Sequence, residues 1–188
     1  MQPSLEIIVA VDTEGGFGKG GQIPWSCKED MKRFTNISKQ CGVTVMGRHT
    51  YADMLNMQMN KDGAEERIKT KGILPGRTSF VVSSTLKQED VIGAEVVPDL
   101  HAVLNKYFET DQRIAVIGGE KLYVQALATA AKIHMTVMDR KYGCDRFLPI
   151  EYVRTHFGIV AENSHAVNTD VDGTTKTIHF ITYARTTR

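Results

Sequence analysis

The chain has 188 residues and a net charge of +1, and its 41% hydrophobic and 24% charged residues are typical of a globular protein. At about 150 residues per domain, this length predicts one domain over residues 1–188. The balanced charge argues against recruitment of nucleic acid or an anionic membrane by a bulk field. Apolar runs such as residues 7–11 are far shorter than the ~20 residues that cross a bilayer.

The cysteines and histidines indicate a compartment and argue against a metal. The three cysteines have no C-x-x-C spacing, and the six histidines show no H-E-x-x-H pattern. We therefore expect no disulfide framework, no metal site and a reducing, cytoplasmic location. The N-terminus has no basic region before its apolar run, which contains Glu6, so no signal peptide is expected.

Apolar β-branched runs alternate with helical patterns through the first 140 residues. Strands are predicted at residues 5–11, 43–46, 79–83, 95–97, 114–117 and 133–138. Helices are predicted at residues 26–40, 48–57, 100–108 and 120–131. This alternation favours a mostly parallel sheet with helices on both faces.

The end of the chain has a different pattern. Residues 157–166 and 174–184 are two β-rich runs, and the Asp172-Gly173 step between them is typical of a hairpin turn. We therefore expect an α/β fold with one central, mostly parallel eight-stranded sheet, flanked by four helices and ending in a C-terminal antiparallel hairpin at one edge. The polar, weakly periodic residues 56–72 are expected to form a surface excursion.

The first predicted helix has an acidic residue on its apolar side. Ser26 and Glu29 form a capping-box pattern, which predicts Ser26 as the N-cap. At ~100° per residue, one apolar stripe contains Cys27, Met31, Phe34, Ile37 and Cys41. The opposite, charged face contains Lys28, Glu29, Lys32, Arg33 and Lys39. Asp30 lies inside the apolar stripe.

A carboxylate in that stripe needs compensation, because burying a charge costs several kcal/mol unless it is paired or hydrogen-bonded. In one interpretation Asp30 only extends the acidic first turn or bonds an internal hydroxyl. In the other, Asp30 lies in an apolar cleft where desolvation raises its pKa. Such a group suits recognition of an N–H pair on a heterocycle, or assistance to proton transfer.

Residues 15–21 form a glycine-rich segment in which Gly16, Gly18 and Gly21 match the G-x-G-x-x-G pattern. The pattern does not predict a Rossmann fold here, because residues 22–25 intervene before the helix. A mobile lid whose backbone approaches a ligand is one interpretation, and a loop without ligand contact is the other.

Two strand-to-helix junctions contain glycine, one at Gly47 and one at the pair Gly118-Gly119. Helix N-termini at the carboxyl ends of parallel strands bind phosphates, and Arg48 adds a bidentate donor. Two such junctions suit a dinucleotide, although glycine also lets a helix pack closely on a strand. Arg77 follows a Pro-Gly turn, where it either clamps a carboxylate or is an ordinary surface arginine.

These motifs, in this order, resemble the dihydrofolate reductase family over about residues 4–185. Residues 8–25 are similar to the family's first strand and active-site loop, and Asp30 falls where the family has its active-site acid. The other matching motifs are residues 45–50, 74–77, 82–84, 116–123, Thr136 and residues 145–147.

The resemblance implies an oxidoreductase that uses NADPH to reduce 7,8-dihydrofolate to 5,6,7,8-tetrahydrofolate, by hydride transfer to pterin C6 and protonation at N5. The implied catalytic residues are Asp30, Trp25 and Thr136. The implied substrate contacts are Ile8, Ile23, Asp30, Met31, Phe34, Arg77, Ile117, Tyr123 and Thr136. The implied cofactor contacts are Ala10, Gly16, Phe17, Gly18, Lys19, Gly20, Gly21, Gln22, Ile23, Gly47, Arg48, His49, Thr50, Ser83, Ser84, Gly118, Gly119, Glu120, Lys121, Leu122 and Tyr123.

Two other functions stay open at this point: a related NADPH-dependent pyrimidine reductase, and a structural module that uses the same fold to bind a nucleotide. Trp25, Asp30 and Arg77 disfavour the first, and the intact glycine junctions disfavour the second. The expected partners are dihydrofolate and antifolate inhibitors, with no nucleic acid and no membrane. We expect the protein to be a monomer.

Overall fold

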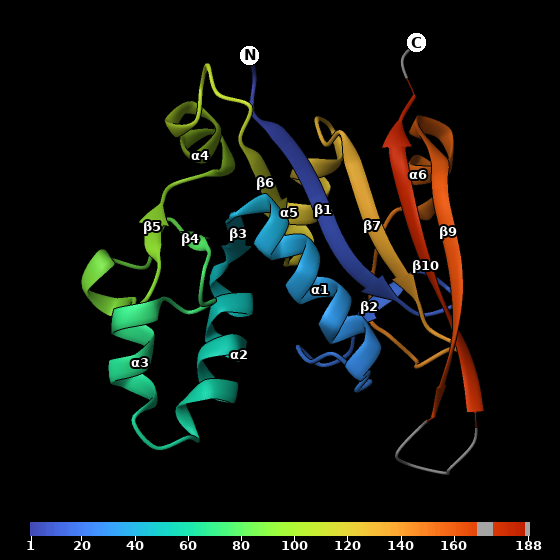
Figure 1. Ribbon diagram of the computed structural model, residues 1–188, viewed down its shortest axis with the longest axis horizontal. Coiled ribbons are helices and arrows are strands. Elements are labelled where there is room, and N and C mark those ends of the chain that lie inside the picture. Colours follow the sequence, from blue (N-terminus) through green and yellow to red (C-terminus); the bar gives the residue numbers. More distant parts are fainter. Residues whose placement is uncertain (169–174, 187–188) are drawn as a thin grey trace.

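The computed structural model describes residues 1–168 and 175–186. Within them, eight strands form one sheet in the order β5-β4-β3-β6-β1-β7-β10-β9 (Figure 1). In chain order these strands are β1 (Ser4–Val11), β3 (Val43–Gly47), β4 (Thr78–Val82), β5 (Glu95–Val97), β6 (Arg113–Val116), β7 (Lys132–Val137), β9 (Phe157–Asn168) and β10 (Thr175–Arg185).

The sheet is parallel from β5 to β7, and β10 runs antiparallel to both β7 and β9. The predicted eight-stranded, mostly parallel sheet with a C-terminal hairpin at one edge is therefore confirmed. The predicted turn at Asp172-Gly173 lies outside the described residues.

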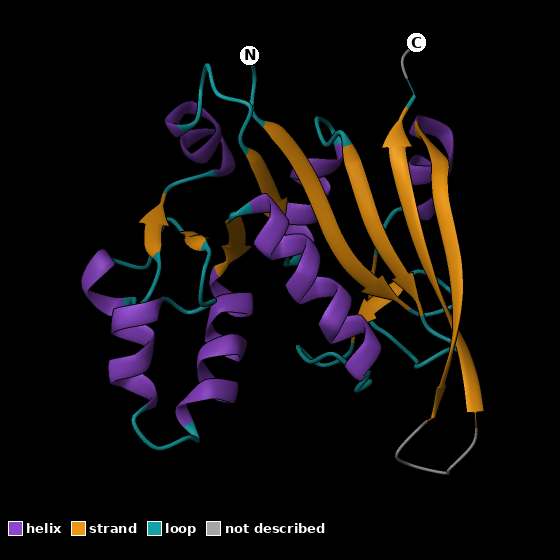
Figure 2. Cartoon of the chain, viewed as in Figure 1, coloured by secondary structure: helices purple, strands orange, loops and turns teal. Residues whose placement is uncertain are grey.

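Helices cover both faces of the sheet (Figure 2). On one face, α1 (Lys28–Cys41), α2 (Arg48–Met59) and α3 (Ala64–Lys71) enclose a core that includes Ile8, Met46 and Ile117. On the other face, α4 (Leu100–Lys106), α5 (Glu120–Leu127) and α6 (Ile150–His156) enclose a core that includes Ile7, Val45 and Val116. Neighbouring strand residues thus alternate between the two cores, as the period of a strand requires.

The four predicted helices are present with shifted ends, and the described residues contain two that were not predicted, α3 and α6. Helix α3 lies in the expected surface excursion. It forms because Ala64 and Ile68, four residues apart in a charged segment, are both buried and Ile68 packs in the core beside α2. Helix α6 has seven residues, and no helical period was recognised in its sequence. A short 3-10 helix spans Gln88–Asp90.

The start of α1 differs from the prediction. The helix begins at Lys28 with Cys27 as its N-cap, so the prediction of Ser26 as N-cap is wrong. The first helical bond runs from the Met31 N–H to the Cys27 carbonyl (3.1 Å), which leaves Ser26 one residue outside the helix and exposed. The capping pattern therefore locates the start of the helix to within one residue but assigns the N-cap to the wrong one.

A second, two-stranded sheet lies beside the main one. It pairs β2 (Gly16–Gly18) with β8 (Arg146–Phe147) in antiparallel fashion. The glycine-rich segment is therefore partly a strand, which joins the end of β1 to the loop after β7. No helix among the described residues is both long and apolar enough to cross a membrane.

Candidate active site

Asp30 is in the first turn of α1, and its carboxylate is turned toward the sheet. It accepts a hydrogen bond from the hydroxyl of Thr136 on β7, a residue that is 1% exposed. Burial raises the pKa of Asp30, while the Thr136 hydrogen bond and the nearby Arg33 partly oppose that rise. The internal hydroxyl bond and the raised pKa are thus both present, and the role of Asp30 in an apolar ligand cleft stays a prediction.

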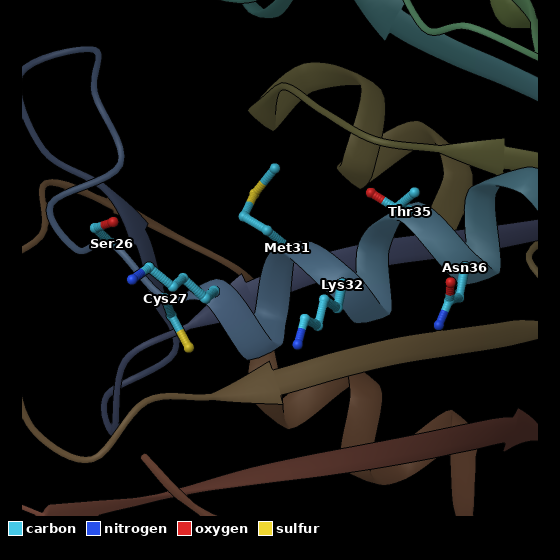
Figure 3. A pocket seen from close by; sticks show the side chains of 7 residues that line it. Ser26, Cys27, Met31, Lys32, Thr35 and Asn36 are labelled. Carbon is cyan, nitrogen blue, oxygen red and sulfur yellow. The ribbon is translucent and has the colours of Figure 1, made fainter. Parts of the chain in front are cut away.

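Met31, the next residue, does not follow the predicted stripe, because its side chain is 57% exposed. It borders a hollow of about 430 Å³ along α1 (Figure 3). In this view Met31 and Thr35 project from one side of the helix, and Lys32 and Asn36 project from another. The hollow is lined by Ser26, Cys27, Lys28, Met31, Lys32, Thr35 and Asn36.

This hollow borders the side of α1 away from Asp30. Ile8 and Phe34, two other predicted substrate contacts, pack in the core cluster on the sheet side of α1. Ile23 is 61% exposed, ahead of the helix. The structure thus brings Ile8 and Phe34 together, and leaves Ile23 and Met31 open to solvent.

The two glycine junctions lie in direct contact. The Gly47 N–H donates to the Gly118 carbonyl (2.7 Å), and the Gly118-Gly119 peptide bond is cis. Gly118 has a φ of 127°, and a Cβ there would lie 3.1 Å from Thr50 Oγ1. These contacts exclude a side chain at Gly118 and bring the two predicted phosphate-binding segments to one edge of the sheet.

Polar side chains flank this edge. Arg48 is exposed and its Nη1 donates to Thr85 Oγ1 (3.4 Å). Ser83 Oγ accepts from the Leu86 N–H at 3.0 Å, and Ser84 is exposed. The other exposed residues of the predicted cofactor set are Lys19, Gly20, Gln22, Ile23, His49, Glu120 and Lys121.

Tyr123 lies between the predicted substrate and cofactor contacts. Its hydroxyl donates to the Ile8 carbonyl (2.9 Å), and its ring meets Phe17 edge-on with centroids 5.4 Å apart. Tyr123 therefore ties α5 to β1 and supports the glycine-rich segment. Leu122 is buried in the core, so a ligand contact there would use the backbone. Ala10 and Trp25 lie together in a third, small cluster.

The glycine-rich segment is fixed at its base and exposed at its tip. Asp12, which is 1% exposed, accepts the N–H groups of Gly16 (2.9 Å) and Tyr142 (3.0 Å). Burial acts to raise the pKa of Asp12, but these backbone donors lower it below its ordinary value. At the tip, Lys19 and Gln22 exchange backbone hydrogen bonds of 2.8 and 3.0 Å.

Arg77 is anchored from the turn before β4. Its Nη1 donates to Ser38 Oγ (2.7 Å) and its Nη2 donates to the Pro75 carbonyl (3.2 Å). Its Nε is buried and has no hydrogen-bond partner among the described groups, and burial lowers the pKa of the side chain. Arg77 is therefore a half-buried, pre-oriented donor and not a freely mobile surface arginine.

Sequence reasoning missed a buried ionic cluster on β1. Glu6, 1% exposed, accepts from Arg113 Nε (2.7 Å) and Nη2 (3.0 Å) and lies 2.7 Å from His134 Nε2. Burial acts to raise the pKa of Glu6, but the bonds from His134 and Arg113 lower it to about 2. An acid inside the apolar run of residues 5–11 was the available signal, because such an acid needs partners.

Arg33 was also missed, because it was predicted to lie on the charged face of α1. The structure turns it toward β10, where its Nη2 donates to the Ile181 carbonyl (3.3 Å) and to Thr182 Oγ1 (3.3 Å). Its position three residues after Asp30 was a usable signal, because residues i and i+3 are neighbours on a helix.

A parallel sheet with two touching glycine junctions beside a buried carboxylate defines an α/β protein suited to a phosphate-bearing ligand. The family model for dihydrofolate reductase matches residues 4–62 and 66–185. The chain therefore belongs to the dihydrofolate reductase family of oxidoreductases, as its motifs predicted.

Single relatives and a solved structure agree with this assignment. The chain is 30% identical to the dihydrofolate reductase of Schistosoma mansoni over 158 residues, which cover 77% of each chain. The dihydrofolate reductase of Drosophila melanogaster is 30% identical over 156 residues, which cover 77% of this chain and 79% of the relative. A dihydrofolate reductase from Enterococcus faecalis, solved with NADP(H) and RAB-propyl, has the same fold, with a TM-score of 0.76 at 22% identity over 98% of this chain and 97% of that one.

Some relatives are much longer than this chain. A bifunctional dihydrofolate reductase-thymidylate synthase of Paramecium tetraurelia is 27% identical over 147 residues. The match covers 77% of this chain and 28% of that relative, so the chain corresponds to about a quarter of it.

Proposed function

We propose that the protein reduces 7,8-dihydrofolate to 5,6,7,8-tetrahydrofolate with NADPH. Family membership supports this reaction, and the Enterococcus faecalis neighbour was solved with NADP(H). The observation that carries the proposal is the half-buried Asp30 carboxylate bonded to Thr136, at the position where the family has its acid. The family match favours this reaction over a pyrimidine reductase or a nucleotide-bound structural module.

Asp30 acts as the acceptor that orients the substrate. A carboxylate can accept several hydrogen bonds, so one filled by Thr136 keeps capacity for the 2-amino and N3 hydrogens of the pterin. Ile8, Phe34 and Ile117 share one core cluster, which would supply the apolar wall of the substrate site. Arg77, with a buried Nε and a fixed guanidinium, binds the α-carboxylate of the substrate's glutamate.

The residues at the glycine junctions fit a dinucleotide. Contact between Gly47 and Gly118 leaves bare backbone at this edge, and Arg48, Thr50, Ser83 and Ser84 add polar groups suited to phosphates. NADPH, when bound, supplies a hydride. The glycine-rich segment then excludes solvent, while water admitted beside Asp30 protonates N5 of the substrate.

A direct assay tests the reaction. Purified protein mixed with NADPH and dihydrofolate should show a falling NADPH absorbance, and an antifolate should stop the fall. NADPH binding without any turnover of dihydrofolate would contradict the proposal and favour the structural module. Turnover of a ribosylaminopyrimidine phosphate in place of dihydrofolate would favour the pyrimidine reductase.

The cofactor assignment has its own test. Replacing Arg48 by leucine removes an exposed cation from the proposed phosphate site. Charge-assisted hydrogen bonds contribute about 1.5–3 kcal/mol, so the KM for NADPH should rise about 10- to 100-fold. Steady-state kinetics should show a much smaller change in the KM for dihydrofolate, and equal changes in both would contradict the assignment.

The compartment and oligomeric state stay predictions. All three cysteines are free thiols, in keeping with the predicted cytoplasmic location. Size-exclusion chromatography with light scattering would test the expected monomer.

A further inference from the structure

Arg33 is a half-buried cation of α1 that the structure holds against β10. Besides its two hydrogen bonds to Ile181 and Thr182, its guanidinium carbon lies 4.9 Å from the centre of the Phe180 ring. Three consecutive residues of β10 therefore fix one side chain of α1. A cation held by a carbonyl, a hydroxyl and an aromatic face has a defined position.

The anchor on β10 is itself supported from below. Thr182 Oγ1 lies 3.5 Å from His134 Nδ1, and His134 Nε2 lies 2.7 Å from Glu6. Because Thr182 Oγ1 accepts from Arg33, its own proton is free to face His134 Nδ1, and Nε2 then donates to Glu6. Every group in this row from Arg33 to Glu6 has a donor or acceptor role that agrees with its neighbours.

Asp30 is the acidic residue one helical turn before Arg33 on α1. The two residues are three apart on α1, and Arg33 interacts electrostatically with the Asp30 carboxylate. Thr136, which bonds Asp30, is paired in register with Phe180, the residue that stacks on Arg33. Asp30 thus contacts β7 through Thr136, and Arg33 contacts β10 through Phe180. Thr136 and Phe180 are paired with each other across these two neighbouring strands.

We propose that Arg33 is a positioning residue for Asp30: its contacts with Phe180, Ile181 and Thr182 hold a positive charge in a fixed place one helical turn from the carboxylate. This inference rests on the proposed function for its meaning in catalysis, because a charged Asp30 is what accepts the N–H groups of the substrate. The family's active-site acid is thereby supported in this chain by a cation on its own helix.

The other charged or titratable groups around the pair do not replace Arg33. Tyr123 on α5 and Cys27 before α1 interact with Asp30, but burial raises the pKa of both, so they are neutral near pH 7. Arg113 on β6 forms a salt bridge with Glu6 on β1, and His134 Nε2 on β7 lies 2.7 Å from the same carboxylate. Removing the Arg33 charge should therefore raise the pKa of Asp30 further.

Carbon-13 NMR titration of the Asp30 carboxyl group tests this inference, with the signal assigned by its loss in Asp30→Asn. In Arg33→Met the titration midpoint should move upward by about half a pH unit or more. Lys32→Met is the matched control, because it removes an exposed cation of the same helix one residue away, and its shift should be smaller. Equal shifts in the two variants, or no shift in Arg33→Met, would overturn the proposal.

Two further variants keep the result interpretable if Arg33→Met folds poorly. Thr182→Val keeps the charge and removes one anchor, so it should move the Asp30 midpoint in the same direction by a smaller amount. Arg33→Lys keeps the charge but loses the planar fork, and it should restore the midpoint at least in part. A Thr182→Val midpoint that matches the unmodified protein would overturn the role of the anchor, and an Arg33→Lys midpoint as high as that of Arg33→Met would overturn the role of the charge.

The titration is separable from the reductase assay. It uses the free protein and needs no turnover, so a protein without reductase activity could still show the Arg33 shift. If the protein is active, the pH dependence of kcat in Arg33→Met should move upward by the same amount as the titration. An unmoved kcat profile beside a moved titration would overturn the catalytic part of the inference alone.

Discussion

Glu6 and Asp30 are two carboxylates at opposite ends of α1. Glu6, on β1, lies near the last turn of the helix, and Asp30 belongs to its first turn. Cys41, the last residue of the helix, has its sulfur 4.0 Å from Glu6. Glu6 is bonded by Arg113 and His134, and its pKa falls to about 2 despite burial. Asp30 accepts a hydrogen bond from Thr136 and interacts electrostatically with Arg33, yet burial keeps its pKa raised.

The difference between the two acids lies in how completely they are bonded. Arg113 Nε and His134 Nε2 each lie 2.7 Å from an oxygen of Glu6, which leaves the carboxylate little capacity for a further ligand. Asp30 has one neutral donor and one nearby cation, so it keeps acceptor capacity at the cost of a less stable ionised form. This contrast supports the proposal that Asp30 is kept for binding, while the bonds of Glu6 tie β1, β6 and β7 together.

The largest expected effect is on activity and concerns Asp30. Asp30→Asn keeps the shape of the side chain and removes its charge, so hydride transfer should fall about 10²- to 10⁴-fold. Stopped-flow measurement of NADPH oxidation gives this rate, and fluorescence titration should show that NADPH still binds. Full activity in the variant would remove the functional distinction between the two acids.

The next effect is on stability and concerns Glu6. Glu6→Gln leaves Arg113 and His134 without their anion in a buried site, which should cost about 3 kcal/mol of unfolding free energy. Urea denaturation followed by circular dichroism measures the change. A loss below about 1 kcal/mol would show that the cluster is not the stabilising element we infer.

Acid should weaken the same cluster. Because the pKa of Glu6 is lowered from 4.5 to about 2, its stabilisation is complete above pH 4.5 and is lost as the pH falls toward 2. At 1.36 kcal/mol per unit, the loss across this window is on the order of 3 kcal/mol. Unfolding curves at several pH values should show the loss in the unmodified protein and a flatter dependence in Glu6→Gln.

The smallest expected effect has the opposite sign and returns to Asp30. Because burial raises its pKa above the unfolded value, ionised Asp30 destabilises the fold at pH values above its folded pKa. Asp30→Asn should therefore raise the unfolding free energy at pH 7 by about 1 kcal/mol while lowering activity. A less stable variant would indicate that the bond to Thr136 outweighs the cost of burial.

Alternation of apolar runs and helical patterns was enough to predict the strands of the sheet, the succession of strands and helices along the chain, and the hairpin at one edge. Asp30 was found because a charge broke the period of an apolar stripe, which is a local signal. Arg33 and His134 were not found, because their partners lie on β10 and β1, far away in the chain. A helical wheel also assumes one buried face, whereas α1 is contacted by β10 along a second side, which is why Arg33 is covered and Met31 is not.

The Asp12 carboxylate has a consequence for how the glycine-rich segment can move. It fastens the base of this segment to the loop after β7 through Gly16 and Tyr142. Near the tip, the Gly20 N–H donates to Asp145 Oδ2 (2.7 Å), so a second carboxylate ties the Lys19–Gln22 turn to the same loop. Opening of the segment would therefore require the Gly20–Asp145 bond to break while the Asp12 bonds at its base hold.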